Sequence, residues 1–285
     1  MPRALTAWLS AQRSIIAGLL FAFAAAAWAL LVWQTGTMGT DAVMTSPTMG
    51  MRAPLFLATW VVMMVAMMFP AAAPMILTFH TVQLRRRQQG EAFVATWVFV
   101  AAYLLVWALS GVVAYAGALA TETIAARAAL SSSAAGRVGG ALLLAAGLYQ
   151  LSPLKDLCLS KCRTPIGFIM TSWRDGTAGA LHMGMLHGTW CLGCCWLLFV
   201  ILFPLGIMNI SAMAAVTLVI CAEKTLPWGR TIARLAAAAL IAYGAAALVW
   251  PQILPTFMAG DGMSTAHEAG TMDMRGMSMP APSGR

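Results

Sequence analysis

The sequence predicts an all-α protein, a polytopic membrane helix bundle. Of its 285 residues, 61% are hydrophobic and only 9% are charged, and the mean hydropathy is +0.81. This composition is typical of integral membrane proteins, and it excludes a soluble globular domain and a disordered chain. Apolar runs long enough to cross a bilayer as helices alternate with short polar segments, and about seven such runs can be distinguished.

The seven expected membrane helices occupy residues 1–255 and form one bundle. Their approximate bounds are 14–33, 55–79, 92–119, 138–151, 178–204, 208–221 and 235–250. Pro70 and Pro74 should break the second helix, because proline has no N–H to donate to the preceding turn. The first run is too long for the apolar region of a cleaved signal peptide, so we expect it to be retained in the mature protein.

Basic residues decide the expected orientation. Their main clusters lie at residues 85–87, 155–174 and 224–234. With seven spans, these clusters share one side with the N-terminal arm, and the positive-inside rule makes that side cytoplasmic. The C-terminus is then extracytoplasmic. Because the net charge of +8 is spread over these loops, it indicates a lipid bilayer as partner and no nucleic acid.

The fifth run carries the residues that indicate a function. Placed at 100° intervals along a helix, one narrow face gathers Met183, His187, Cys191 and Cys194, with Cys195 at its edge. Thiolate, imidazole and thioether groups all bind soft or borderline metal ions. Ionisable groups inside a membrane are energetically costly, so we interpret this face as a metal site. The alternative is that the cysteines act as small apolar residues between closely packed helices.

The second run has a stripe of methionines. Met64 and Met68 share one helical face, and Met63 and Met67 share another. Thioethers bind copper(I), so the stripe could pass an ion inward, and the two prolines could open the helix along that pathway. Methionine is also a common filler of apolar cores, and packing alone is the alternative.

A C-x-x-x-C motif, Cys158 and Cys162, lies in the polar segment before the fifth run, on the expected cytoplasmic side. The neighbouring cations Lys155, Lys161 and Arg163 should lower the pKa of these thiols and favour metal-binding thiolates. We expect the pair to receive or deliver the ion inside the cell. A redox pair and two unrelated thiols are the alternatives.

Two polar features bound the sixth run. At its end, Glu223 and Lys224 are adjacent opposite charges, which we interpret as an anchor or structural pair; proton coupling by Glu223 is the alternative. Asn209, near its outer end, should hydrogen-bond across helices.

Residues 256–285 form a polar tail that we expect to be disordered. Its methionines have no core to fill, and we expect the tail to capture copper or silver outside the cell through Met272, Met274, Met277, Met279 and His267. More methionines lie in the first outer loop, whereas all cysteines lie within the expected bilayer or on its cytoplasmic side. Thioethers stay ligands where thiols would be oxidised, so this segregation suits a protein that faces an oxidising compartment.

A set of short motifs runs through residues 55–228. The motifs are W-x-x-M-x-x-A-M-M-x-P at 60–70, Y-Q-x-S-P-L-K at 149–155, C-x-x-x-C-R at 158–163, W-R-x-G at 173–176, H-G-x-x-C-x-G-C-C-W at 187–196, G-x-M-N at 206–209 and E-K at 223–224. This set resembles a bacterial family of predicted metal-binding integral membrane proteins, a domain-of-unknown-function family. The resemblance implies metal binding. With the predicted spans, it leads us to expect a multi-pass protein of the bacterial cytoplasmic (inner) membrane.

Together these observations predict a protein that binds copper(I), or another soft metal ion, and passes it between extracytoplasmic methionines and buried His/Cys ligands. It would act as a copper transporter or metallochaperone, with a periplasmic or cytoplasmic copper chaperone as partner. ATP use is not expected, because the sequence has no phosphate-binding loop motif. We therefore do not expect an enzyme. The alternatives are an intramembrane thiol oxidoreductase, which would be an enzyme, and a non-catalytic membrane assembly subunit.

Overall fold

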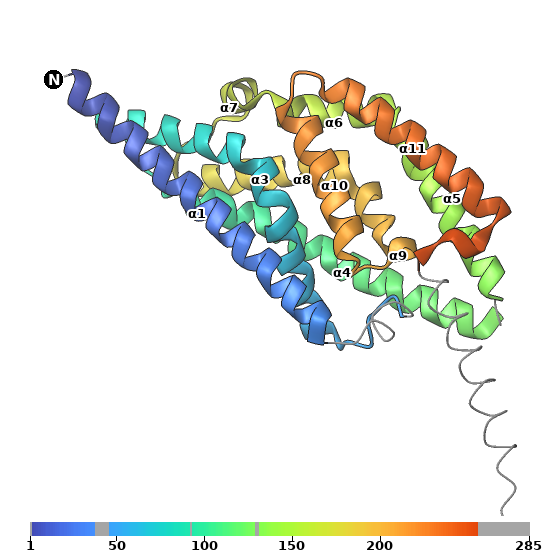
Figure 1. Cartoon of the computed structure of the whole chain (residues 1–285). Coiled ribbons are helices and arrows are strands. Elements are labelled where there is room, and N and C mark those ends of the chain that lie inside the picture. The colour runs from blue at the N-terminus through green and yellow to red at the C-terminus, as the bar shows by residue number, and fades with distance from the viewer. Residues whose placement is uncertain (1, 38–45, 92, 129–130, 256–285) are drawn as a thin grey trace, which may run out of the picture.

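The computed structural model describes residues 2–37, 46–91, 93–128 and 131–255 (Figure 1). Every regular element in these ranges is a helix, so the predicted all-α class is confirmed. The elements are α1 (Pro2–Thr37), α3 (Ala53–Gln88), α4 (Thr96–Ala128), α5 (Ser132–Gln150), α6 (Pro153–Arg163), α7 (Pro165–Ser172), α8 (Gly176–Val200), α9 (Leu202–Leu205), α10 (Ile210–Thr225), α11 (Gly229–Val249) and the 3₁₀ turn η1 (Pro251–Ile253).

Five helical segments of the described residues are long and apolar enough to cross a membrane. They are Ala11–Thr37, Ala53–Gln88, Thr96–Ala128, Gly176–Leu205 and Gly229–Val249. The two other expected spans form α5 and α10, which are shorter than these five. The count of seven membrane spans therefore stays a prediction.

The second expected span does not break at its prolines. It forms one continuous helix, α3, which changes direction in its middle (Figure 1). Pro70 cannot donate a hydrogen bond to the carbonyl of Ala66 one turn earlier. Trp28 of α1 replaces the missing donor, because its Nε1–H donates to that carbonyl at 3.1 Å. The neighbouring helix thus satisfies the backbone group that the proline frees, and the kinked helix remains intact.

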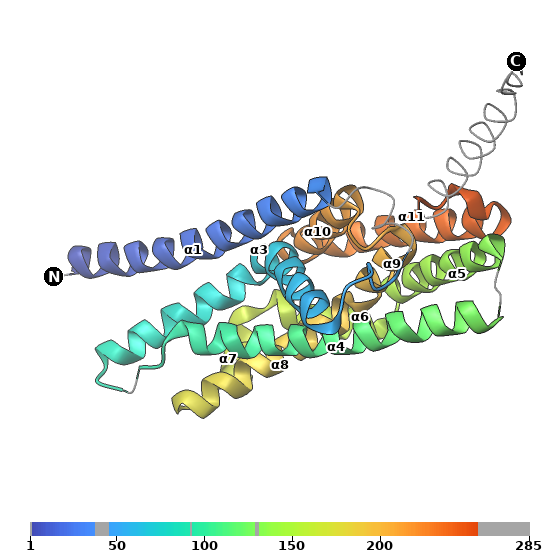
Figure 2. The ribbon, with the colours of Figure 1, turned by 90° about the horizontal axis from the view of Figure 1, so that it is seen from below.

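Helices α4 and α8 pack side by side through the centre of the molecule (Figure 2). Two glycines of α8 allow this approach: a Cβ on Gly184 would collide with the carbonyl oxygen of Phe99, and a Cβ on Gly188 would lie 2.9 Å from Val106. The residue number increases along both helices from the first pair to the second, so α4 and α8 run parallel. Small residues at helix contacts are the usual route to close packing in membrane proteins.

The short helices α6 and α7 connect α5 to α8. The side chain of Ser152 caps α6 by accepting a hydrogen bond from the backbone N–H of Lys155 at 3.2 Å, and Pro153 occupies the first turn. Helix α6 lies against α8 (Figure 2). Gly193 of α8 makes room there, because a Cβ at this position would lie 2.9 Å from the sulfur of Cys158.

A tight connection through α9 leads from α8 to α10. Gly206 has a φ of 91°, a conformation that glycine adopts without strain. Asn209 then caps its own helix, with its Oδ1 accepting from the N–H of Ala212 at 3.0 Å and its Nδ2 donating to the carbonyl of Leu205. Because Leu205 is the last residue of α9, the side chain of Asn209 hydrogen-bonds from one helix to another, as the sequence predicted.

Helices α5 and α11 form an antiparallel pair at one end of the bundle (Figure 1). Their backbones meet at glycines. A Cβ on Gly244 would lie 2.6 Å from the backbone nitrogen of Leu144 and 2.8 Å from the carbonyl oxygen of Gly140. Backbone atoms cannot turn aside as a side chain can, so even one methyl group would force the two helices apart.

We expect Gly244→Ala to lower the free energy of unfolding by about 1–3 kcal/mol, the usual cost of overpacking a close contact. The matched control is Gly18→Ala on α1, where a Cβ meets no atom within 4 Å. Thermal unfolding in detergent, followed by circular dichroism, measures both variants. Equal transition temperatures for the two would contradict the close contact of α5 with α11.

Candidate metal centre

Helix α8 presents its predicted metal-binding face to the protein interior. His187 is 2% exposed, and the three cysteines of α8 are 1% exposed or less. Helices α4 and α6 both pack against α8, and α10 approaches it as well. The glycines of α8 described above allow these approaches. The histidine and cysteines of α8 therefore lie where neighbouring helices approach its backbone closely.

Four thiols from α6 and α8 meet in one group, which we call the thiol cluster: Cys162, Cys191, Cys194 and Cys195. The Sγ of Cys194 lies 3.2 Å from the Sγ of Cys195 and donates to the carbonyl of Cys191 at 3.1 Å. From α6, the thiol of Cys162 interacts with those of Cys191 and Cys194. All six cysteines of the chain are free thiols in the structure. Thiols from two helices thus interact with one another in the interior of the bundle.

Two polar groups from other helices meet the thiol cluster at Cys191. The ammonium of Lys224 in α10 donates to its Sγ at 2.9 Å, and the hydroxyl of Tyr103 in α4 lies 3.1 Å from the same sulfur. Lys224 is only 8% exposed, and Tyr103 is fully buried. A cation beside a cysteine favours the thiolate, which is the form that binds metal ions.

Glu223 and Lys224 do not pair with each other, although they are adjacent in the sequence. One carboxylate oxygen of Glu223 accepts from the Nζ of Lys155 at 2.7 Å, and the other accepts from the Nε2 of Gln150 at 2.9 Å. All three side chains are buried. The expected Glu223–Lys224 pair is therefore wrong: Glu223 joins α10 to α5 and α6, whereas Lys224 turns to the thiols.

His187 lies one helical turn before Cys191, enclosed by aromatic rings. Its ring stacks on those of Tyr103 and Phe99, with centroids 5.5 and 6.0 Å away, and meets the edge of Phe168 at 5.6 Å. Within the described ranges, neither ring nitrogen of His187 has a hydrogen-bond partner. A buried imidazole with both nitrogens unsatisfied calls for an explanation, and a soft-metal ligand is one.

The predicted cytoplasmic pair, Cys158 and Cys162, is not a site separate from α8. Cys162 belongs to the thiol cluster, and Cys158 packs against Gly193 of α8. The prediction that nearby cations lower the pKa of both thiols is wrong. Burial raises the pKa of Cys158, and the hydrogen bond with a thiol of α8 raises the pKa of Cys162. The cations face other groups, since Lys155 pairs with a carboxylate and Arg163 donates to a backbone carbonyl.

The methionines named by the sequence fall into two sets. Those of the helices are fully buried, in the same apolar core as the thiol cluster: Met64, Met67, Met68 and Met183. Their role as ligands stays a prediction. The proposed tail ligands lie outside the described residues: Met272, Met274, Met277, Met279 and His267.

The sequence did not identify two of the groups at the thiol cluster. A lysine at the end of an apolar run needs a polar partner, so the sequence indicated that Lys224 has one. The adjacent Glu223 was the expected partner, and a thiol was not expected. For Tyr103 the sequence gave no indication, because it is one aromatic residue among many in an apolar run. Only the packing of α4 and α10 on α8 brings both of them to Cys191.

The thiol cluster is not a preformed metal site. In the part of the chain that the structure describes, no group of three or more His, Cys, Asp and Glu side chains is arranged to hold a metal ion. The thiols instead bond to one another, to Lys224 and to a backbone carbonyl. Metal binding therefore requires these thiols to exchange hydrogen bonds for metal bonds, with thioether or imidazole groups as further ligands.

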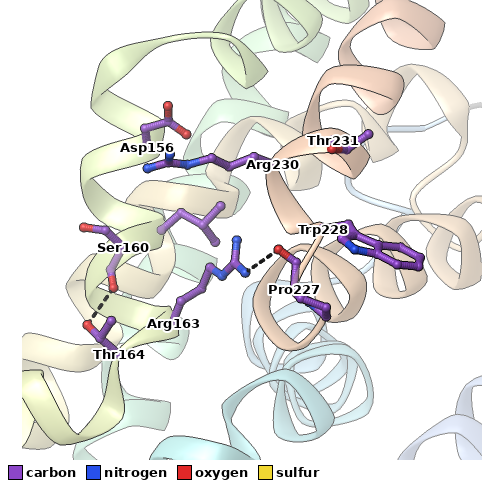
Figure 3. Close-up of a pocket in the computed structure, with 9 residues that line it drawn as sticks. Asp156, Ser160, Arg163, Thr164, Pro227, Trp228, Arg230 and Thr231 are labelled. Carbon is purple, nitrogen blue, oxygen red and sulfur yellow. Dashed lines mark hydrogen bonds between the residues drawn. The ribbon is translucent and has the colours of Figure 1, made fainter.

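A cavity of about 450 Å³ opens at the surface beside α6, where the loop between α10 and α11 approaches it (Figure 3). It is lined by Asp156, Leu159, Ser160, Arg163, Thr164, Pro227, Trp228, Arg230 and Thr231. Arg163 donates to the carbonyls of Leu226 and Pro227, which ties α6 to this loop. The described thiols do not line the cavity, so it is not the candidate metal centre.

The fold and the site thus define a helical bundle whose interior holds clustered thiols, a histidine without a hydrogen-bond partner in the described ranges and a buried cation. The model of one protein family, PpoB2, described as a copper chaperone, matches residues 57–248, which is more than half of the chain. The chain therefore belongs to this copper chaperone family, and the expected membership of a metal-binding family is confirmed. The match spans every residue of the thiol cluster together with Tyr103 and Lys224. No curated protein and no solved structure matches the chain.

We expect Lys155→Met to lower the free energy of unfolding by about 3–5 kcal/mol, because it leaves a buried carboxylate unpaired. The double variant Lys155→Met/Glu223→Leu should recover part of this loss, since it removes both charges. Denaturant unfolding in detergent measures both. If the double variant is no more stable than the single one, the pair is not the buried contact that the structure shows.

Proposed function

We propose that this protein is an integral membrane copper chaperone or transporter that binds copper(I) at the thiol cluster. The observation that carries the proposal is the contact of Cys162 in α6 with Cys191 and Cys194 in α8, within a chain of a copper chaperone family. Clustered thiolates select soft ions, and the family is described as a copper chaperone, so copper in its soft form, copper(I), is the proposed cargo. Another soft metal ion is the alternative cargo.

The outward surface of the bundle supports a membrane location. Helices α1, α4 and α11 expose large apolar side chains such as Phe21, Val113 and Leu235. Soluble monomers rarely expose continuous apolar surfaces, so a lipid bilayer is the natural covering. With α5 and α10 as two further spans beside the five long helices, we propose a multi-pass protein of the bacterial cytoplasmic membrane.

Contacts between the helix ends support the proposed orientation. The basic end of α3 meets the start of α8, where Arg86 pairs with Asp175 at 2.7 Å. Arg163 of α6 contacts the loop between α10 and α11. The first contact joins the basic segment 85–87 to the segment before α8, and the second joins α6 to the basic segment 224–234. We therefore propose that these segments share the cytoplasmic side with the N-terminus. The C-terminus is then extracytoplasmic.

The proposed path of the ion runs from thioethers to thiols. The tail and the first outer loop collect copper(I), the buried methionines of α3 and α8 relay it, and the thiol cluster holds it together with His187. Each step exchanges one soft ligand for another, so no catalysis and no ATP are needed. A periplasmic or cytoplasmic copper chaperone is the proposed protein partner at either end of the path.

Replacing Cys191 by serine removes the sulfur that hydrogen-bonds with Lys224 and Tyr103 and interacts with the thiol of Cys162. We expect Cys191→Ser to weaken copper(I) binding by at least roughly tenfold, because a hard hydroxyl replaces a soft ligand. Competition with a chromophoric copper(I) chelator measures the affinity of the purified protein in detergent. The matched control is Cys221→Ser, which changes a thiol of α10 outside the thiol cluster. Equal affinity of the Cys191 variant and wild type would exclude the proposed site.

The tail gives a separate prediction. Truncation after Pro255 should reduce the number of copper(I) ions bound per chain, because it removes four clustered methionines and His267. It should leave the affinity of the tightest site unchanged, since the thiol cluster remains. Mass-spectrometric metal analysis of both forms after equilibration with copper(I) gives the two stoichiometries. A truncated protein that binds as many ions as the full chain would show that the tail captures none.

The second candidate function is an intramembrane thiol oxidoreductase. The 3.2 Å separation of the sulfurs of Cys194 and Cys195 favours it. Against it, adjacent residues of a helix point in different directions, and a disulfide between them distorts the backbone. Differential alkylation and mass spectrometry decide between the functions, because only the oxidoreductase forms a stoichiometric, reversible disulfide.

A further inference from the structure

Lys224 is the cation at the thiol cluster, and its surroundings define what it can do. Its Nζ donates to the Sγ of Cys191 at 2.9 Å. Its charge also interacts with the three other thiols of the cluster. Within the described ranges, Lys224 forms no ion pair with a carboxylate, since the adjacent Glu223 is bound to Lys155 and Gln150.

We infer that Lys224 is the fixed counter-cation of the bound metal and makes the thiol cluster selective for a singly charged ion. This inference rests on the proposed function. It deepens that function by giving a residue outside the ligand set a role in metal selectivity. Lys224 acts through electrostatics on the metal–thiolate group and is not itself a ligand.

The charge balance explains the selectivity. When a singly charged ion binds to two cysteines, each thiol that becomes a ligand loses its proton to water. Two thiolates and the ion together carry a charge of −1, and the ammonium of Lys224 brings the total to zero. An uncompensated charge is costly in a buried site, so neutrality stabilises this state. A divalent ion on the same two thiolates would form a neutral group, and with the ammonium of Lys224 the total charge would be +1.

The packing keeps the ammonium in this place. Helix α10 is joined to α5 and α6 by the Glu223 contacts, and its next residue faces α8. The neighbouring carboxylate therefore cannot neutralise Lys224 without breaking a fully buried ion pair. Of these two adjacent residues, Glu223 thus pairs with Lys155 between helices, whereas Lys224 places its positive charge beside the thiols.

The test compares two soft ions that differ in charge, Ag⁺ and Cd²⁺, on the full-length protein in detergent. Lys224→Gln keeps a hydrogen-bond donor but removes the charge. We expect it to weaken Ag⁺ binding by roughly ten- to hundredfold, the usual effect of losing a charged donor, and to weaken Cd²⁺ binding much less or not at all. The affinity ratio of Ag⁺ to Cd²⁺ therefore falls. Lys224→Arg keeps the charge and should keep the ratio.

Arg230→Gln on α11 is the matched control, because it removes an exposed cation that lines the surface cavity and should leave both affinities unchanged. If Lys224 has only a structural role, Lys224→Gln lowers the affinities for Ag⁺ and Cd²⁺ by the same factor. That result would overturn the inference. Wild-type protein that binds neither ion would instead overturn the proposed function. If no neutral variant folds, the wild type decides: equimolar Cd²⁺ that displaces bound Ag⁺ would overturn the inference, and retention of Ag⁺ would support it.

Discussion

Close approach of helix backbones to α8 is the constraint on which the rest of the structure depends. Three glycines of α8, at positions 184, 188 and 193, leave space for α4 and α6. Because no side chains separate these helices, Tyr103 and Cys162 come within contact of Cys191. Larger residues at these positions would push α4 and α6 outward and divide the thiol cluster. The glycines of the H-G-x-x-C-x-G-C-C-W motif are thus as much a part of the site as its cysteines.

Buried polar groups are costly, and this protein satisfies them in two separate networks that begin at adjacent residues. Glu223 is neutralised by Lys155 and receives a further hydrogen bond from Gln150, which fastens α5, α6 and α10 together. Lys224 contacts a thiol and no carboxylate among the described residues. Separating the two charges keeps the scaffold rigid and leaves one cation at the thiols. At the proposed metal site, the thiols thus bond to one another and to Lys224, so they have partners in the absence of metal.

The prolines of α3 illustrate how the bundle tolerates local defects. Proline removes a backbone donor, and in an apolar environment the free carbonyl needs another partner. Trp28 supplies that partner from the neighbouring helix. The methionine stripe of α3 therefore lies on an intact, bent helix. A broken helix is not required for these thioethers to lie in the apolar core that also contains the thiol cluster.

The sequence by itself determined the helical class, the approximate position of each long helix and the polar face of α8. Hydrophobic run length and 3.6-residue periodicity are local properties, so they can be read without a fold. It also placed five candidate ligands on one face of α8, because they follow one another at helical spacing, and the structure buries all five. Only the tertiary structure decided that Cys162 joins these thiols, that α3 bends without breaking and that Lys224 turns away from Glu223. These features depend on contacts between residues far apart in the chain, where the shape of a neighbouring helix, and not local sequence, selects the partner.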